Sequence, residues 1–289
     1  MTGEPAAAEV LACCTAIYSH PLARILLGDF LHPGGAALSR CLLELLGVRA
    51  GSRVLDVAAG TGATALLAAR QHGCHVIAIE QSAELVAAAQ AAVEAAGLAG
   101  QVEVLRGDAE ALPVGSASAD AVLCECALCT FARPEVAVAE LVRVLRPGGL
   151  AGITDVTRRG ELPASLSGAV ARAACLAGAL PPEGYRALLE AGGLAVVGEE
   201  DHRAAAAALA VSVHDKLAAA ELLERLGHLR LPDGTVGRAR EVLRDVRAAI
   251  ADGRLGYGLW VAEKPAGPGA GRQAASTASI AGRSAGVRL

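Results

Sequence analysis

Aromatic side chains are scarce in this sequence, and basic charge is not in excess. Of its 289 residues only 2% are Phe, Trp or Tyr, and the net charge at pH 7 is −4. Surfaces that bind nucleic acid need a field of basic charge, and those that bind single strands also need aromatic rings on which bases stack. The composition therefore argues against a nucleic-acid partner.

Long uncharged apolar runs are also missing, although 53% of the residues are hydrophobic. The longest, residues 204–213, lies between Arg203 and His214 and is far shorter than the roughly 18 residues that a membrane helix needs. The first ten residues carry two acidic residues and no basic segment, which predicts no secretory signal. We expect a soluble, cytoplasmic protein that does not contact a membrane.

The sequence contains eight cysteines. Without a secretory signal, eight cysteines do not indicate a disulfide framework; they are either small core side chains or a thiol site. A structural zinc site needs a second close pair of ligands, which the sequence does not offer, so we predict no metal site. The eight lie at positions 13, 14, 41, 74, 124, 126, 129 and 175.

From residue 51 to about residue 155 the pattern alternates between apolar strands and helices. Such alternation predicts a parallel sheet with helices on both faces. The clearest helix runs from Ser82, a typical N-cap residue, to Ala96, with Gly97 at its end. Strands are expected at Val54–Val57, His75–Ile79, Val102–Leu105, Ala121–Cys124 and Leu150–Thr154.

The remaining segments complete the predicted architecture. Residues 194–197 and Gly256–Pro265 are expected to be strands, the last one antiparallel at the sheet edge. The fold class is therefore α/β, Rossmann-like, with a seven-stranded, mostly parallel sheet. We expect a helical N-terminal cap over residues 1–50, which forms a lid, and a main domain over 51–265 with its core motifs in 51–160. Within that domain, residues 164–178 and 182–191 are expected to be helices and a helical insertion covers about 201–253. Residues 266–289 are expected to be a disordered tail.

A glycine-rich turn follows the first strand. Gly60, Thr61 and Gly62 separate that strand from the next helix, and a turn this tight lets a nucleotide-like ligand lie against the backbone. Asp56 inside the strand disfavours a phosphate and suits a cation. A dinucleotide-binding domain with a similar turn is the alternative.

Carboxylates follow the next two strands as well. Glu80, followed by Gln81, is suited to a bidentate bond with ribose hydroxyls. Asp108, followed by Ala109, can accept a hydrogen bond from an exocyclic amine such as that of adenine.

Four motifs in order resemble the class I S-adenosylmethionine-dependent methyltransferases of the type 11 or ubiquinone-biosynthesis kind: VLDVAAGTG, IAIEQS, LRGDAEALPV and AELVRVLRPGGLAGITDV. The resemblance covers about residues 40–160. It implies S-adenosylmethionine as cofactor and methyl transfer to a small molecule by in-line displacement. It also implies that Asp56, Gly60 and Gly62 face the methionine end, Glu80 the ribose and Asp108 the adenine, with Thr61, Gln81 and Ala109 beside them.

The segment CECALC and the segment around Cys175 resemble the arsenite methyltransferase branch. That resemblance implies that Cys126 and Cys175 bind a trivalent metalloid acceptor, which thiolates favour. The branch generally has a further ligand cysteine after Cys175, which is missing here. Cys124 and Cys129 are the candidates to replace it. On a regular strand Cys124 and Cys126 point the same way and Glu125 points the opposite way.

Two other interpretations stay open. His32, in the segment before the main domain, is a candidate base for an oxygen or carbon acid, or else a surface or capping histidine. The protein is then a carbon or oxygen methyltransferase of the quinone-biosynthesis type. A thiol-based sensor that binds the nucleoside without turnover is the non-enzymatic alternative.

Overall fold

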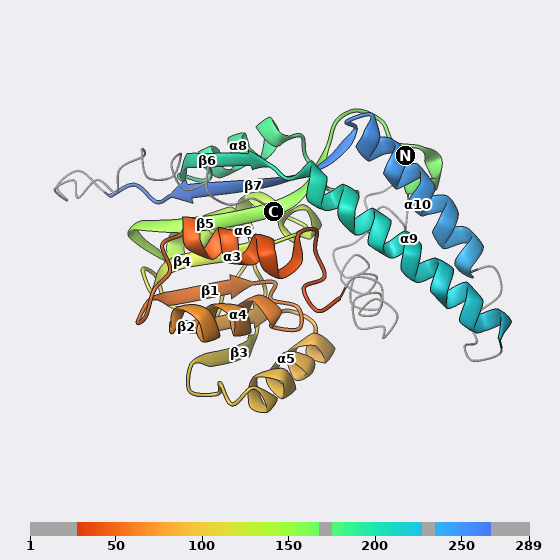
Figure 1. Ribbon diagram of the computed structural model, residues 1–289. Helices are drawn as coiled ribbons and strands as arrows, with labels where there is room; N and C mark the ends of the chain where they lie inside the picture. Colours follow the sequence, from red (N-terminus) through yellow and green to blue (C-terminus); the bar gives the residue numbers. More distant parts are fainter. Residues whose placement is uncertain (1–27, 168–174, 227–234, 267–289) are drawn as a thin grey trace.

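A seven-stranded sheet forms the centre of the computed structural model, which describes residues 28–167, 175–226 and 235–266 (Figure 1). The strand order is β3-β2-β1-β4-β5-β7-β6. The first five strands pair in parallel, and β7 runs antiparallel to both β5 and β6. The predicted Rossmann-like α/β fold is confirmed. The strands are β1 (Arg53–Val57), β2 (His75–Glu80), β3 (Val102–Arg106), β4 (Ala119–Glu125), β5 (Leu145–Arg158), β6 (Ala195–Asp201) and β7 (Leu255–Glu263).

Helices cover both faces of the sheet because side chains of the central strands are apolar on both sides. On one face, Leu55 of β1 packs in a buried cluster with residues of α6 and α8; on the other, Val54 packs with residues of α3 and α4. Ser82 caps α5 as predicted, since its side chain accepts a hydrogen bond from the Leu85 amide. The helices are α3 (Gly35–Leu45), α4 (Ala63–His72), α5 (Ala83–Ala95), α6 (Pro134–Val144), α8 (Pro182–Ala191), α9 (Arg203–Arg225) and α10 (Thr235–Ala251).

Strand β7 is antiparallel as expected, but its predicted place at the sheet edge is wrong. It lies between β5 and β6, and the edge strands are β3 and β6. The residues of β7 are buried from Leu255 to Ala262, whereas those of β6 are partly or fully exposed. The continuous apolar run of β7 is typical of a strand that is covered on both faces. The acidic end of β6 suits an edge, where charge opposes pairing with another chain.

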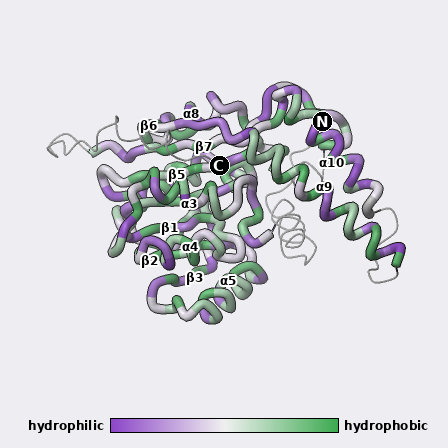
Figure 2. The backbone as a smooth tube through the Cα atoms, in the orientation of Figure 1, coloured by the Kyte–Doolittle hydropathy of each residue, from purple (hydrophilic) through white to green (hydrophobic). Residues whose placement is uncertain are grey.

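Helices α9 and α10 lie side by side and extend beyond the sheet (Figure 1). Their shared interface includes the buried side chains of Leu217 and Leu243. Hydrophobic and hydrophilic residues both occur along α9 (Figure 2), and the large apolar side chains of Val211, Leu222 and Leu223 are exposed. No helix in the described part of the chain is both long enough and apolar enough to cross a membrane.

Three predictions concern residues that the structure leaves out in whole or in part. Most of the N-terminal cap, including Cys13 and Cys14, and nearly all of the predicted tail lie outside the described residues. The helix predicted from Ala164 to Gly178 is wrong at its start. A single 3-10 turn covers Ala164–Leu166 and ends because Ser167 is extended; residues 168–174 lie outside the described ranges.

Candidate functional site

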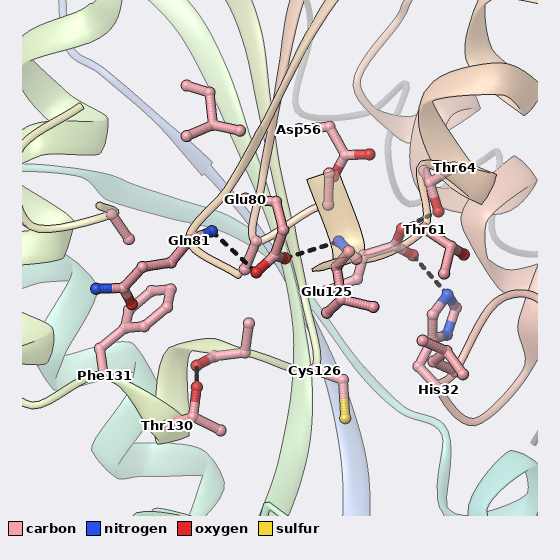
Figure 3. Close-up of a pocket in the computed structure, with 18 of the residues that line it drawn as sticks. His32, Asp56, Thr61, Thr64, Glu80, Gln81, Glu125, Cys126, Thr130 and Phe131 are labelled. Atoms are coloured by element: carbon pink, nitrogen blue, oxygen red, sulfur yellow. Dashed lines mark hydrogen bonds and ion pairs between the residues drawn. The ribbon is translucent and has the colours of Figure 1, made fainter. Parts of the chain in front are cut away.

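A cavity of about 530 Å³ opens at the carboxyl ends of β1, β2 and β4 (Figure 3). Its wall comes from residues 29–32, the turn after β1, the end of β2, the loop after β3 and the residues that follow β4. This is where open parallel sheets bind ligands, and the volume suits a small molecule or cofactor.

The turn after β1 brings backbone close to the cavity because three of its residues have left-handed conformations. These are Ala58, Gly60 and Gly62, with φ of 59°, 57° and 78°. Gly60 and Thr61 line the cavity. Gly62 does not: it starts α4, and a β-carbon there would lie 3.3 Å from that of Ala89.

Glu80 joins the end of β2 to this turn. Its carboxylate is buried and accepts hydrogen bonds from the amides of Gly60 at 3.0 Å and of Gln81 and Ser82, both at 2.9 Å. Burial raises the pKa of Glu80, and the three amides oppose that rise. A carboxylate has about four acceptor positions, so one position stays available to a ribose hydroxyl. The bidentate ribose bond stays a prediction.

Asp56 is a buried carboxylate whose hydrogen bonding is incomplete. Its Oδ2 has no hydrogen bond, and the residue lines the cavity. Burial, followed by the charges of Glu125 and Glu80, raises the pKa of Asp56 to about 8. A buried polar atom without a partner is costly, so this end of the cavity is suited to a ligand that carries a positive charge or a donor.

The Asp56→Asn variant is expected to be more stable than the wild type in the absence of ligand, by a margin that grows from pH 5 to pH 8. The unfolded carboxyl titrates near pH 4, whereas the folded one titrates at about 8. Between these values the folded protein binds more protons than the unfolded chain, so stability falls as the pH rises through this window. Asparagine removes that loss. Thermal denaturation at several pH values measures the margin, and a constant margin would contradict the prediction.

The loop after β3 forms the opposite end of the cavity. Asp108, Ala109 and Gln81 line it, and their roles at adenine and ribose stay predictions. The Oδ1 atom of Asp108 accepts from the Glu110 amide at 2.8 Å. Glu110 in turn forms an ion pair with Arg133 at 2.8 Å, which ties this loop to the segment that precedes α6.

Three cysteine side chains lie close together beside the cavity. Cys126 and Cys175 line it. The Cys129 thiol donates to the carbonyl oxygen of Cys175 at 3.2 Å, and the Cys175 thiol donates to the carbonyl oxygen of Cys126 at 3.5 Å. The Cys175 hydrogen bonds, followed by burial, raise the pKa of both Cys126 and Cys129 well above the ordinary thiol value. The thiols are therefore protonated at neutral pH. Asp155 accepts from the Cys129 amide at 2.9 Å.

Cys124 does not belong to this group. It is fully buried in the core with residues of α6 and α8, whereas Cys126 packs on the opposite face of the sheet. The prediction that the two share a face is wrong because β4 ends at Glu125 and Cys126 has a left-handed φ of 54°. That conformation breaks the alternation of a regular strand. Within the described residues no group of three His, Cys, Asp or Glu side chains is arranged to hold a metal ion.

Glu125 is the main lining residue that the sequence did not predict. It was expected to face away from Cys126, yet both line the cavity. His32, the predicted base, also lines the cavity and is buried, so it is not a surface histidine. A charged residue directly at the end of a parallel strand was the available signal for Glu125.

The fold and the cavity together define a nucleoside-binding α/β protein. Residues 55–153 match the methyltransferase domain family. An uncharacterized protein of Haemophilus influenzae is 38% identical over 129 residues, which cover 44% of this chain and 51% of that protein. The ubiquinone/menaquinone biosynthesis C-methyltransferase UbiE of Ectopseudomonas oleovorans is 35% identical over 127 residues, 43% of this chain and 75% of that protein.

Solved structures show the same fold. The [4+2]-cyclase SpnF aligns with a TM-score of 0.68 at 25% identity, over 89% of this chain and 94% of that one. A phosphoethanolamine N-methyltransferase of Haemonchus contortus, bound to S-adenosylhomocysteine, aligns with a TM-score of 0.75 at 19% identity, over 91% of this chain and 61% of that one. The chain belongs to the class I S-adenosylmethionine-dependent methyltransferase family. It spans about half the length of the first curated relatives it matches.

Proposed function

We propose that this protein transfers a methyl group from S-adenosylmethionine to a small molecule. The observation that carries the proposal is the unpartnered Oδ2 of Asp56 beside the glycine turn. Six carboxylates line the cavity against one arginine and one histidine. This acidic lining opposes a pyrophosphate and suits a cofactor with a sulfonium and an ammonium group. The carboxylates are those of Asp29, Asp56, Glu80, Asp108, Glu110 and Glu125.

The lining residues fit such a cofactor from end to end. Asp56, Gly60 and Thr61 would hold the methionine part, the open acceptor position of Glu80 the ribose, and Asp108 the adenine. When bound, the cofactor supplies an electrophilic methyl group on a positively charged sulfur. The protein then has to orient the acceptor in line and exclude water.

The affinity for S-adenosylmethionine is expected to rise about tenfold per pH unit between pH 5.5 and 7.5. Asp56, whose pKa is about 8 without ligand, has to lose its proton before it can face a cation. Titration calorimetry measures both the affinity and the proton released. In Asp56→Asn the affinity should be lower and should vary little over this range. An equal pH dependence in the variant and the wild type would contradict the assignment.

For the acceptor we propose a thiol-bound trivalent metalloid such as arsenite. The support is that Cys126 and Cys175 line the cavity, with the Cys129 thiol hydrogen-bonded to the backbone of Cys175. Arsenous acid, As(OH)₃, releases one water for each thiol that it takes up, so protonated thiols of Cys126 and Cys175 would supply the protons that leave. The arsenic keeps a lone pair, which would attack the methyl carbon without a general base.

A carbon or oxygen acceptor of the quinone-biosynthesis type is the second candidate. The similarity to UbiE supports it, as does the buried pair of His32 and Glu125 at the cavity, whose nitrogen and oxygen are 3.5 Å apart. A nucleoside-binding sensor is the third, and it would bind the cofactor without turnover.

Mass spectrometry of the products separates these candidates. Purified protein is incubated with S-adenosylmethionine, a thiol reductant and either arsenite or a panel of phenols and quinols. Methylated arsenic supports the metalloid proposal. A methylated phenol or quinol without methylated arsenic would overturn it, and cofactor binding without any product would support the sensor.

A further inference from the structure

Glu125, the last residue of β4, is a buried carboxylate in the cavity wall, with 5% of its side chain exposed. Two hydroxyl groups donate to it. Ser39 Oγ, on α3, lies 2.9 Å from Oε1, and Thr64 Oγ1, on α4, lies 2.7 Å from Oε2. His32 Nε2 lies 3.5 Å from Oε1 (Figure 3). Two segments that are distant from Glu125 in sequence, residues 32–39 and α4, therefore converge on this carboxylate.

Hydrogen bonds tie this cluster together. Ser39 Oγ and Thr64 Oγ1 donate to Glu125 and lie 3.2 Å from each other. His32 Nδ1 lies 2.9 Å from the carbonyl oxygen of Pro33, and His32 Nε2 lies 3.2 Å from Ser39 Oγ. Two hydroxyl groups and one imidazole ring thus hold the Glu125 carboxylate in the cavity wall.

These donors leave part of Glu125 for a ligand. Of about four acceptor positions on a carboxylate, Oε1 uses two and Oε2 uses one. Asp56, with its unpartnered Oδ2, lines the same cavity, and the charge of Glu125 contributes to the raised pKa of Asp56. An ammonium group has three N–H donors and can bond both carboxylates at once.

We infer that Glu125 binds the α-ammonium group of the methionine moiety of S-adenosylmethionine, together with Asp56. Ser39, Thr64 and His32 are positioning residues that orient the carboxylate. The inference rests on the proposed function. It adds to the cofactor site a residue that lies outside the motifs Val54–Gly62, Ile77–Ser82 and Leu105–Val114.

Calorimetry with two ligands tests this inference. One ligand is S-adenosylhomocysteine, and the other is an analogue in which hydrogen replaces the α-ammonium group. Glu125→Gln should weaken S-adenosylhomocysteine binding by about 10- to 100-fold, as expected for loss of a charge-assisted hydrogen bond. The same variant should bind the analogue as the wild type does. Glu44→Gln, at an exposed position of α3, is the matched control and should change neither affinity.

A pair of variants at Thr64 provides a second comparison, should Glu125→Gln fail to fold. Thr64→Val should weaken S-adenosylhomocysteine binding more than analogue binding, and Thr64→Ser should restore it. Equal losses for both ligands would overturn the inference. So would unchanged affinity in Glu125→Gln with a raised KM for the acceptor, which would place an acceptor amine at Glu125. A wild-type protein that binds neither ligand would overturn the proposed function as well.

Discussion

Replacement of Glu80 by alanine is expected to weaken cofactor binding by about 100-fold and to lower the melting temperature by about 3 to 10 °C. Two effects combine. The variant loses the carboxylate that would hold the ribose, and it leaves the amides of Gly60, Gln81 and Ser82 without their acceptor. The variant also no longer buries a carboxylate, and that burial is unfavourable, as the raised pKa of Glu80 indicates. This gain offsets part of the loss, so we expect the free energy of unfolding to fall by about 1–3 kcal/mol.

Two measurements separate the effects at Glu80. Thermal denaturation without ligand measures the stability lost at the glycine-rich turn. Calorimetry with S-adenosylhomocysteine measures the affinity lost at the binding site. Glu94→Ala, at an exposed position of α5, is the matched control and should change neither. Wild-type affinity in Glu80→Ala would show that the ribose is not bound there.

Cys126→Ser and Cys175→Ser are each expected to lower arsenite methylation by about 100-fold or more, because a second thiol on the same acceptor raises its binding through effective concentration. Affinity for S-adenosylhomocysteine should stay within about twofold of the wild type, since hydroxyl and thiol have similar size and neither thiol is among the groups proposed to hold the cofactor. Product formation under subsaturating arsenite is the measurement.

Cys41→Ser is the matched control for both cysteine variants, because Cys41 lies on α3 and does not line the cavity. Its methylation rate should match that of the wild type. Equal losses in all three variants would point to damaged folding, and full activity in Cys126→Ser would remove the thiols from the reaction. If the acceptor is a phenol or quinol, both cavity variants should keep their activity.

Most residues proposed to hold the cofactor could be picked out from the sequence because their signals are local. Asp56 lies one residue before the end of β1, Glu80 ends β2 and Asp108 follows β3, and the carboxyl ends of parallel strands meet at one edge. The glycine turn and the Ser82 cap depend on residues within one turn of chain. These features required no knowledge of how distant segments pack.

The acceptor end was less predictable because it depends on one backbone dihedral angle and on long-range packing. The left-handed φ of Cys126 turns its side chain to the cavity and separates it from Cys124, which no alternation rule anticipates. The partners of Glu125 come from α3 and α4, and Cys175 approaches Cys129 across 46 positions of sequence. The interior position of β7 likewise follows from sheet topology rather than from its own residues.

The interior position of β7 also has a consequence for how the protein is made. During synthesis β5 and β6 leave the ribosome before β7, and in the described part of the chain β6 pairs with β7 alone. Until residues 255–263 emerge, one side of β5 and all of β6 carry unpaired backbone groups, which are templates for aggregation. Helices α9 and α10 lengthen that interval, since both are translated in between. A stall or truncation within α10 should therefore yield a chain in which β1 to β5 are complete. The free side of β5 and the whole of β6 could then pair with strands of other chains.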